Sequence, residues 1–60
     1  MDPNATWEDV LAALIKREPG AAIDAGGHLA SWLMKGGFKP KAWEEHPSLE
    51  ILFWAWMDEQ

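Results

Sequence analysis

Two histidines are the strongest candidate metal ligands in this 60-residue chain, because the chain contains no cysteine. Asp24 and His28 lie four residues apart, so a helix would place both side chains on one face, as in half of a zinc site. Any further ligand would have to come from His46, Glu44 or Glu45. A surface pair of Asp24 and His28 that supports its own helix explains the spacing more simply. We therefore expect no metal site and no cofactor.

The arrangements typical of catalysis are also missing. Ser31 follows His28 by three residues, which is a commonplace spacing on a helix, and Ser48 is better placed as a helix cap. The glycine pairs 26–27 and 36–37 lack the Lys-Ser/Thr signature of a phosphate-binding loop. A chain this short has no room for a pocket of ~300 Å³ or more that encloses a ligand. We expect neither enzymatic activity nor a small-molecule substrate.

The charge pattern argues against general binding to nucleic acids. The chain carries 5 basic and 10 acidic side chains, a net charge of −5, whereas nucleic-acid binding needs cations that displace counterions. Three lysines nevertheless cluster between two acidic stretches: Lys35, Lys39 and Lys41. They could contact a phosphate or an acidic partner, although a solvated loop is the simpler interpretation. The alternative function is that of a small regulatory protein. Its basic patch would contact either nucleic acid or an enzyme that acts on nucleic acid.

Nothing in the sequence resembles a targeting signal. The first residues are acidic and polar, unlike the basic and then apolar start of a secretory signal peptide. The longest apolar run, Ile51–Met57, falls far short of the ~18–20 residues that span a bilayer. We expect a cytoplasmic protein with no membrane span.

Proline and glycine divide the chain into three expected helices. The first covers about residues 7–17, with Thr6 as its N-cap and a stripe of apolar residues spaced three and four apart: Trp7, Val10, Leu11, Leu14 and Ile15. The second covers about residues 20–35 and ends at Gly36-Gly37. The third covers about residues 48–58, since a lone strand there would have no partner strand.

Two segments leave alternatives open. Gly26-Gly27 either interrupts the second helix, or belongs to a continuous helix in which Ala22, Gly26 and Ala30 form a smooth groove for another backbone or a Trp ring. The connector 38–47 can hold a short helical turn at 41–45, with Trp43 anchored in the core. The fold class that follows is a single all-α domain, residues 1–60, in which an antiparallel helical hairpin is crossed by the third, apolar helix.

Some of these residues resemble a known group of proteins. The opening Asp2-Pro3-Asn4-Ala5-Thr6, and the later segment Trp32-Leu33 followed by Gly36-Gly37-Phe38, Pro40 and Trp43, resemble small uncharacterised bacterial and phage proteins that begin DPNATL. The resemblance covers about the first 43 residues and implies a helical hairpin, without implying an activity. This chain differs in having Trp7 where leucine is usual, in Gly26-Gly27, and in its apolar segment from Ser48 onward.

The feature most informative about function is an excess of large apolar side chains. Five tryptophans and two phenylalanines are more than the interior of so short a chain is expected to bury, and tryptophan is enriched at binding hot spots. The competing interpretation is that these rings simply fill a small core. Because Trp54 and Trp56 cannot share one helix face, we expect Trp54 to be exposed with Met57 or Ile51. The sequence thus predicts a non-enzymatic interaction module that binds a protein partner or itself through Ile51, Trp54, Trp56 and Met57.

Overall fold

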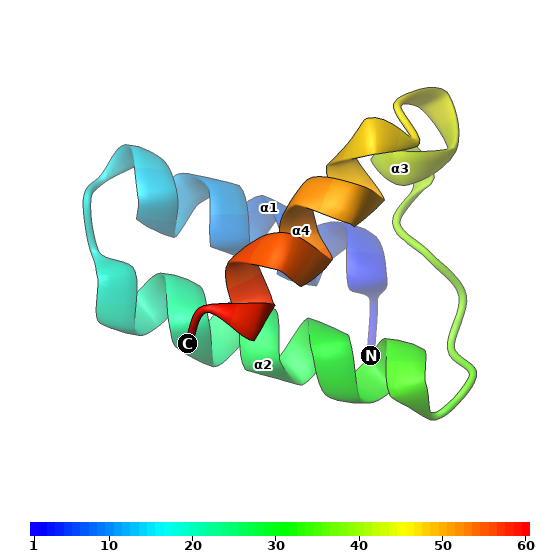
Figure 1. Ribbon diagram of the computed structural model, residues 1–60, viewed down its shortest axis with the longest axis horizontal. Coiled ribbons are helices and arrows are strands. Elements are labelled where there is room, and N and C mark those ends of the chain that lie inside the picture. Colours follow the sequence, from blue (N-terminus) through cyan, green and yellow to red (C-terminus); the bar gives the residue numbers. More distant parts are fainter.

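The computed structural model describes residues 1–60 as four helices without any strand: α1 (Pro3–Ile15), α2 (Pro19–Met34), α3 (Lys41–Glu45) and α4 (Ser48–Asp58). Helices α1 and α2 lie side by side as an antiparallel hairpin, and α4 runs obliquely across the hairpin in the view of Figure 1. The prediction of an all-helical chain whose first two helices pack together is confirmed. The expected three helices become four, because the turn at 41–45 forms a short helix of its own.

Helix α1 begins four residues earlier than expected, and its N-cap is Asp2 rather than Thr6. The Asp2 Oδ1 atom accepts a hydrogen bond of 2.9 Å from the backbone N–H of Asn4. Pro3 occupies the first helical position, where its fixed φ suits the helix and its missing N–H costs nothing. Thr6 lies inside the helix and its hydroxyl donates to the Asp2 carbonyl. The Asp-Pro pair is therefore the true start signal.

Both helices of the hairpin end in a left-handed residue. Arg17 (φ 57°) follows α1, which ends two residues earlier than expected, and Gly36 (φ 89°) follows α2. In each case two backbone N–H groups turn back to carbonyls of the last turn: Arg17 to Leu14 and Glu18 to Ala13, then Gly36 to Leu33 and Gly37 to Trp32. This paired closure is the Schellman motif, and glycine is the residue that usually adopts its left-handed position.

Helix α2 is continuous through Gly26-Gly27, so the continuous alternative is confirmed. Gly26 is buried, and a Cβ atom built on it would lie 2.8 Å from Cζ3 of Trp56. The missing side chain thus lets the indole of Trp56 approach the backbone of α2. Gly27 faces open space, where a Cβ atom would meet nothing within 4 Å.

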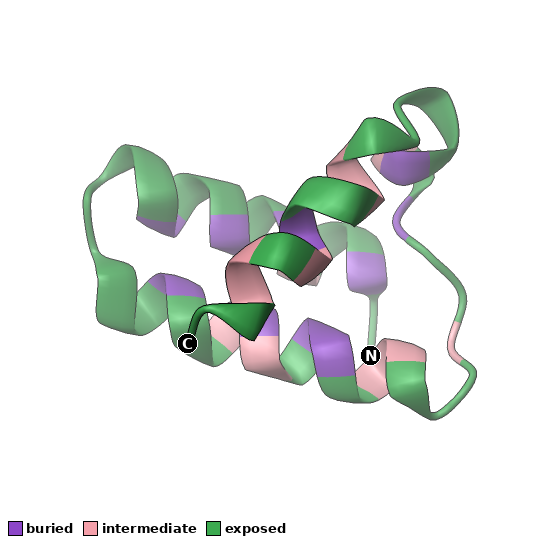
Figure 2. Cartoon of the chain, viewed as in Figure 1, coloured by how far each residue is buried: buried purple, intermediate pink, exposed green.

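The core joins all four helices, and the buried positions face inward between them (Figure 2). Its aromatic centre is formed by Trp7, Trp43 and Phe53, with Trp7 edge-on to Trp43 at 5.4 Å between ring centroids. Trp43 is only 2% exposed, so it anchors the connector as expected. The buried cluster comprises Trp7, Val10, Leu29, Ala30, Trp43 and Phe53.

Candidate functional site

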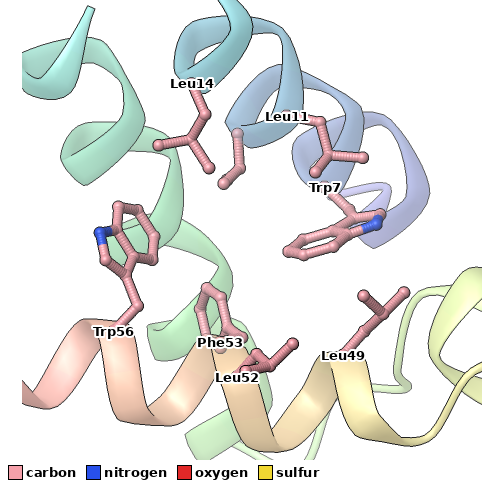
Figure 3. A pocket seen from close by; sticks show the side chains of 8 residues that line it. Trp7, Leu11, Leu14, Leu49, Leu52, Phe53 and Trp56 are labelled. Atoms are coloured by element: carbon pink, nitrogen blue, oxygen red, sulfur yellow. The ribbon is translucent and has the colours of Figure 1, made fainter. Parts of the chain in front are cut away.

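An apolar groove lies between α1 and α4, with a volume of about 240 Å³. Helix α1 contributes Trp7, Val10, Leu11 and Leu14. Helix α4 contributes Leu49, Leu52, Phe53 and Trp56. The labelled side chains from the two helices face one another across this space in Figure 3. Every lining residue is hydrophobic, so the groove offers contact surface rather than reactive groups.

The two walls of the groove follow the same helical pattern. On each helix the lining residues fall at i, i+3, i+4 and i+7, which is one face over two turns. At a rise of 1.5 Å per residue, each wall is roughly 10 Å long. Trp7 and Leu49 lie at one end of the groove, and Leu14 and Trp56 lie at the other (Figure 3). The walls are thus matched in length.

The groove has a firm floor and an exposed rim. Val10 is 1% exposed and Phe53 is 3% exposed, and Phe53 packs edge-on against Trp7. The rim leucines, by contrast, are open to solvent: Leu11 is 40% exposed, Leu14 47% and Leu52 63%. The same two helices bury Val10 and Phe53 in the core, so the exposed leucines are held in place while their apolar surface stays uncovered.

The structure does not gather the four predicted binding residues into one surface. Trp56 lines the groove, whereas Ile51 is 70% exposed and lies outside it. Trp54, which the sequence led us to expect at the surface, is half-buried with its ring 5.2 Å from that of Phe53. Met57 is also half-buried against the core. The uncovered apolar surface is therefore mainly aliphatic rather than made of tryptophan.

Sequence reasoning missed Leu11, Leu14 and Leu52 as candidate surface residues. Leu11 and Leu14 belong to the apolar stripe of the first helix. The spacing of that stripe predicted that all of its residues face the core. The signal that could have separated them is the width of the stripe. In a domain this small, the short helices that pack against a wide stripe bury only part of it and leave the rest uncovered.

The basic patch is partly neutralised within the chain. The Nζ of Lys39 lies 2.9 Å from Oε1 of Glu50 in α4, and this is the only ion pair of the structure. The backbone N–H of Lys41 donates to Oδ1 of Asn4 at 2.7 Å, which ties the start of α3 to α1. Lys35 lies at the end of α2 and borders a shallow, mixed hollow. The three lysines therefore do not form a single free cationic surface.

No family model matches the chain, and no curated protein or solved structure matches it. No three His, Asp or Glu side chains converge as a metal site would require. None of the helices has both the length and the apolar character needed to cross a membrane. The groove between α1 and α4 is thus the feature from which a function can be argued.

Proposed function

We propose that this chain is a non-enzymatic interaction module that binds a helical segment of a partner protein in the groove between α1 and α4. The observation that carries the proposal is the exposed rim of an entirely apolar groove. Leu11, Leu14 and Leu52 each leave at least 40% of their surface in water, so the fold of the single chain uses only part of their apolar surface. An exposed apolar groove of this kind is a common place for a protein partner to bind.

The shape of the groove favours a helix as the occupant. Two helical walls with matching i, i+3, i+4, i+7 spacing leave a seam into which a third helix can lay its own apolar stripe. At about 240 Å³ the groove is smaller than the ~300–1,000 Å³ of pockets that enclose small molecules. Its rim leucines are exposed on both walls, so a row of side chains from one segment can reach them.

The gain on docking comes from covering half-exposed leucines. Full burial of one leucine side chain contributes ~1.5–3 kcal/mol, so the uncovered parts of Leu11, Leu14 and Leu52 are worth about 2–4 kcal/mol together. Association costs offset part of any such gain. The leucines of the peptide are buried at the same time and bring a comparable gain. After association costs, a two-turn peptide alone should therefore bind weakly, with a dissociation constant on the order of 0.1–1 mM. Trp56, Val10 and Phe53 define the shape of the groove, but they are already largely covered and contribute little newly buried area.

The predicted binding residues take different roles in this proposal. Trp56 contacts the occupant directly, because it lines the groove. Trp54 and Met57 act behind it by supporting Phe53 and Trp56. Ile51 lies outside the groove and makes no contact with the occupant, which provides a control on the same helix.

A helical peptide of about 14 residues with a neutral solvent face tests the proposal. It carries leucine at i, i+3, i+4 and i+7 with glutamine, serine and alanine elsewhere, and a fluorescent label reports binding by anisotropy. We expect saturable binding that Leu52→Glu weakens at least about tenfold and that Ile51→Glu leaves within about twofold. Both positions are exposed, so both variants should fold, which circular dichroism checks. Equal loss in both variants, or no saturable binding, would contradict the proposal.

Self-association is the competing outcome, since a second copy could also cover the groove. Molar mass from light scattering over a concentration series separates the two. A monomer across the series supports a separate partner. A dimer that Leu52→Glu dissociates and Ile51→Glu preserves would replace the partner with a second copy.

A further inference from the structure

We infer that the segment received by the groove is a basic amphipathic helix, with an apolar stripe bordered by lysine or arginine. This inference rests on the proposed function and narrows it to one chemistry of partner. It is carried by the charges of the two helices that form the groove, which all have the same sign.

Helices α1 and α4 contain no lysine or arginine. Their charged side chains are four carboxylates: Glu8, Asp9, Glu50 and Asp58. Only Glu50 has an ion-pair partner, Lys39. The basic residues of the chain lie instead in the turn after α1 and around the end of α2 and the start of α3. An occupant lying between α1 and α4 therefore meets helices whose own charges are all negative, and three of these four carboxylates have no ion-pair partner.

Helical spacing puts two exposed carboxylates next to residues that line the groove. Glu8 precedes the rim residue Leu11 by three positions on α1, so both lie on the same side of that helix. Glu59 follows Trp56 by three positions and Leu52 by seven, and its backbone (φ −82°, ψ −9°) continues the helical path of α4. Each helix of the groove thus has a carboxylate beside its apolar residues. A lysine or arginine next to the apolar stripe of a bound helix would lie close to these carboxylates.

The same charges disfavour a second copy as the occupant. Each chain has a net charge of −5, and a symmetric pair through the groove would bring both acidic walls together. Like charges brought together across an interface oppose association, and complementary ones speed encounter and select the partner. A cationic segment in the groove would be attracted by these carboxylates, whereas an acidic segment would be repelled and a neutral one would gain nothing from them.

Three peptides with the same leucine positions test the inference. One has lysine on its solvent face, one has glutamine and serine, and one has glutamate. We expect the lysine peptide to bind about tenfold or more tighter than the glutamate peptide in 0.05 M salt, with the gap closing as salt screens the charges. If the neutral peptide binds and lysine gives no advantage, the inference fails while the docking proposal stands. If none of the three binds, the docking proposal fails and takes the inference with it.

Substitution of the rim carboxylates locates the effect. Glu8→Gln and Glu59→Gln should each weaken the lysine peptide about two- to fivefold and leave the neutral peptide unchanged, because exposed ion pairs are individually weak. Asp24→Asn removes the same unit of charge from α2, which lines no part of the groove, and should change both peptides by less than about 1.5-fold. Equal losses in all three variants would show a nonspecific effect of net charge and overturn the assigned site.

Discussion

The indole of Trp56 lies against the backbone of Gly26, so closely that a Cβ atom on Gly26 would come within 2.8 Å of Cζ3 and 3.1 Å of Cη2. The Sδ atom of Met57 would be 3.0 Å away. This contact seats α4 on α2, and it sets the position of the ring that closes one end of the groove. Gly26 therefore positions a side chain of the groove although it lines no part of the groove itself.

The close contact predicts opposite effects for the two neighbouring glycines. Gly26→Ala gains helix propensity but forces Trp56 and Met57 outward, so we expect a net loss of about 1–2 kcal/mol in the free energy of unfolding. Gly27→Ala meets no atom within 4 Å and should gain up to about 1 kcal/mol. Urea denaturation followed by tryptophan fluorescence measures both. Equal stabilisation by the two substitutions would show that Trp56 does not rest on Gly26.

Arg17 offers a second test of the backbone. It is the only residue other than glycine with a positive φ, at 57°, and a left-handed conformation costs an L-residue roughly 1–2 kcal/mol. Arg17→Gly should therefore raise the stability by up to about 1 kcal/mol, after allowing for the greater freedom of glycine when unfolded. Lys16→Gly is the matched control, because Lys16 is right-handed (φ −78°) and should lose stability by about 0.5–1 kcal/mol. If Lys16→Gly raised the stability and Arg17→Gly lowered it, the left-handed conformation of Arg17 would be contradicted.

The start of α1 separates the structure from the sequence-based expectation. Asp2→Ala removes the side chain that accepts the hydrogen bond from the backbone N–H of Asn4, so it should lower the free energy of unfolding by about 1 kcal/mol. Thr6→Ala removes one exposed hydroxyl contact inside the helix and should cost less than about 0.5 kcal/mol. Thermal unfolding in parallel shows which residue caps the helix. If Thr6→Ala lost more stability than Asp2→Ala, the helix would begin after Thr6, as the sequence led us to expect.

The sequence predicted the larger features because each depends on local rules. The helical class follows from apolar spacing, and the third expected helix matches Ser48–Asp58. A close neighbour at Gly26 follows from the small residues around it, and of the two predicted kinds, a backbone or a Trp ring, the structure has the ring of Trp56. The start of α1 was missed because Thr6 and Asp2 are both good caps, and only tertiary contacts select one. One such contact is the hydrogen bond from Lys41 N–H to Asn4, which spans 37 residues.

The groove could not be read from the sequence for a different reason. A stripe of leucines predicts that a helix has an apolar side, but the angle between α1 and α4 decides which leucines that side buries. The same holds for Trp54, which is half-buried with its ring 5.2 Å from that of Phe53. The number of large rings predicted excess apolar surface, whereas the exposed large apolar side chains are aliphatic except for Phe38, and among them only Leu11, Leu14 and Leu52 line the groove.

The alternative function, contact with nucleic acid through the basic patch, gives a separate prediction. With a net charge of −5 and Lys39 already paired to Glu50, the chain should show no retention of a double-stranded DNA fragment in 0.1 M salt. Substitution of Lys35, Lys39 and Lys41 by glutamine should leave that result unchanged. Retention that falls with salt and is lost in the triple variant would favour the alternative function.

The most direct test is to map, by amide and methyl NMR of the labelled chain, where the neutral leucine-stripe peptide binds. We predict that shift changes concentrate on Leu11, Leu14, Leu52 and Trp56, with Met34 and Asp24 of α2 unaffected. Changes centred on Ile51 and Trp54, or spread evenly over the chain, would contradict a binding site between α1 and α4.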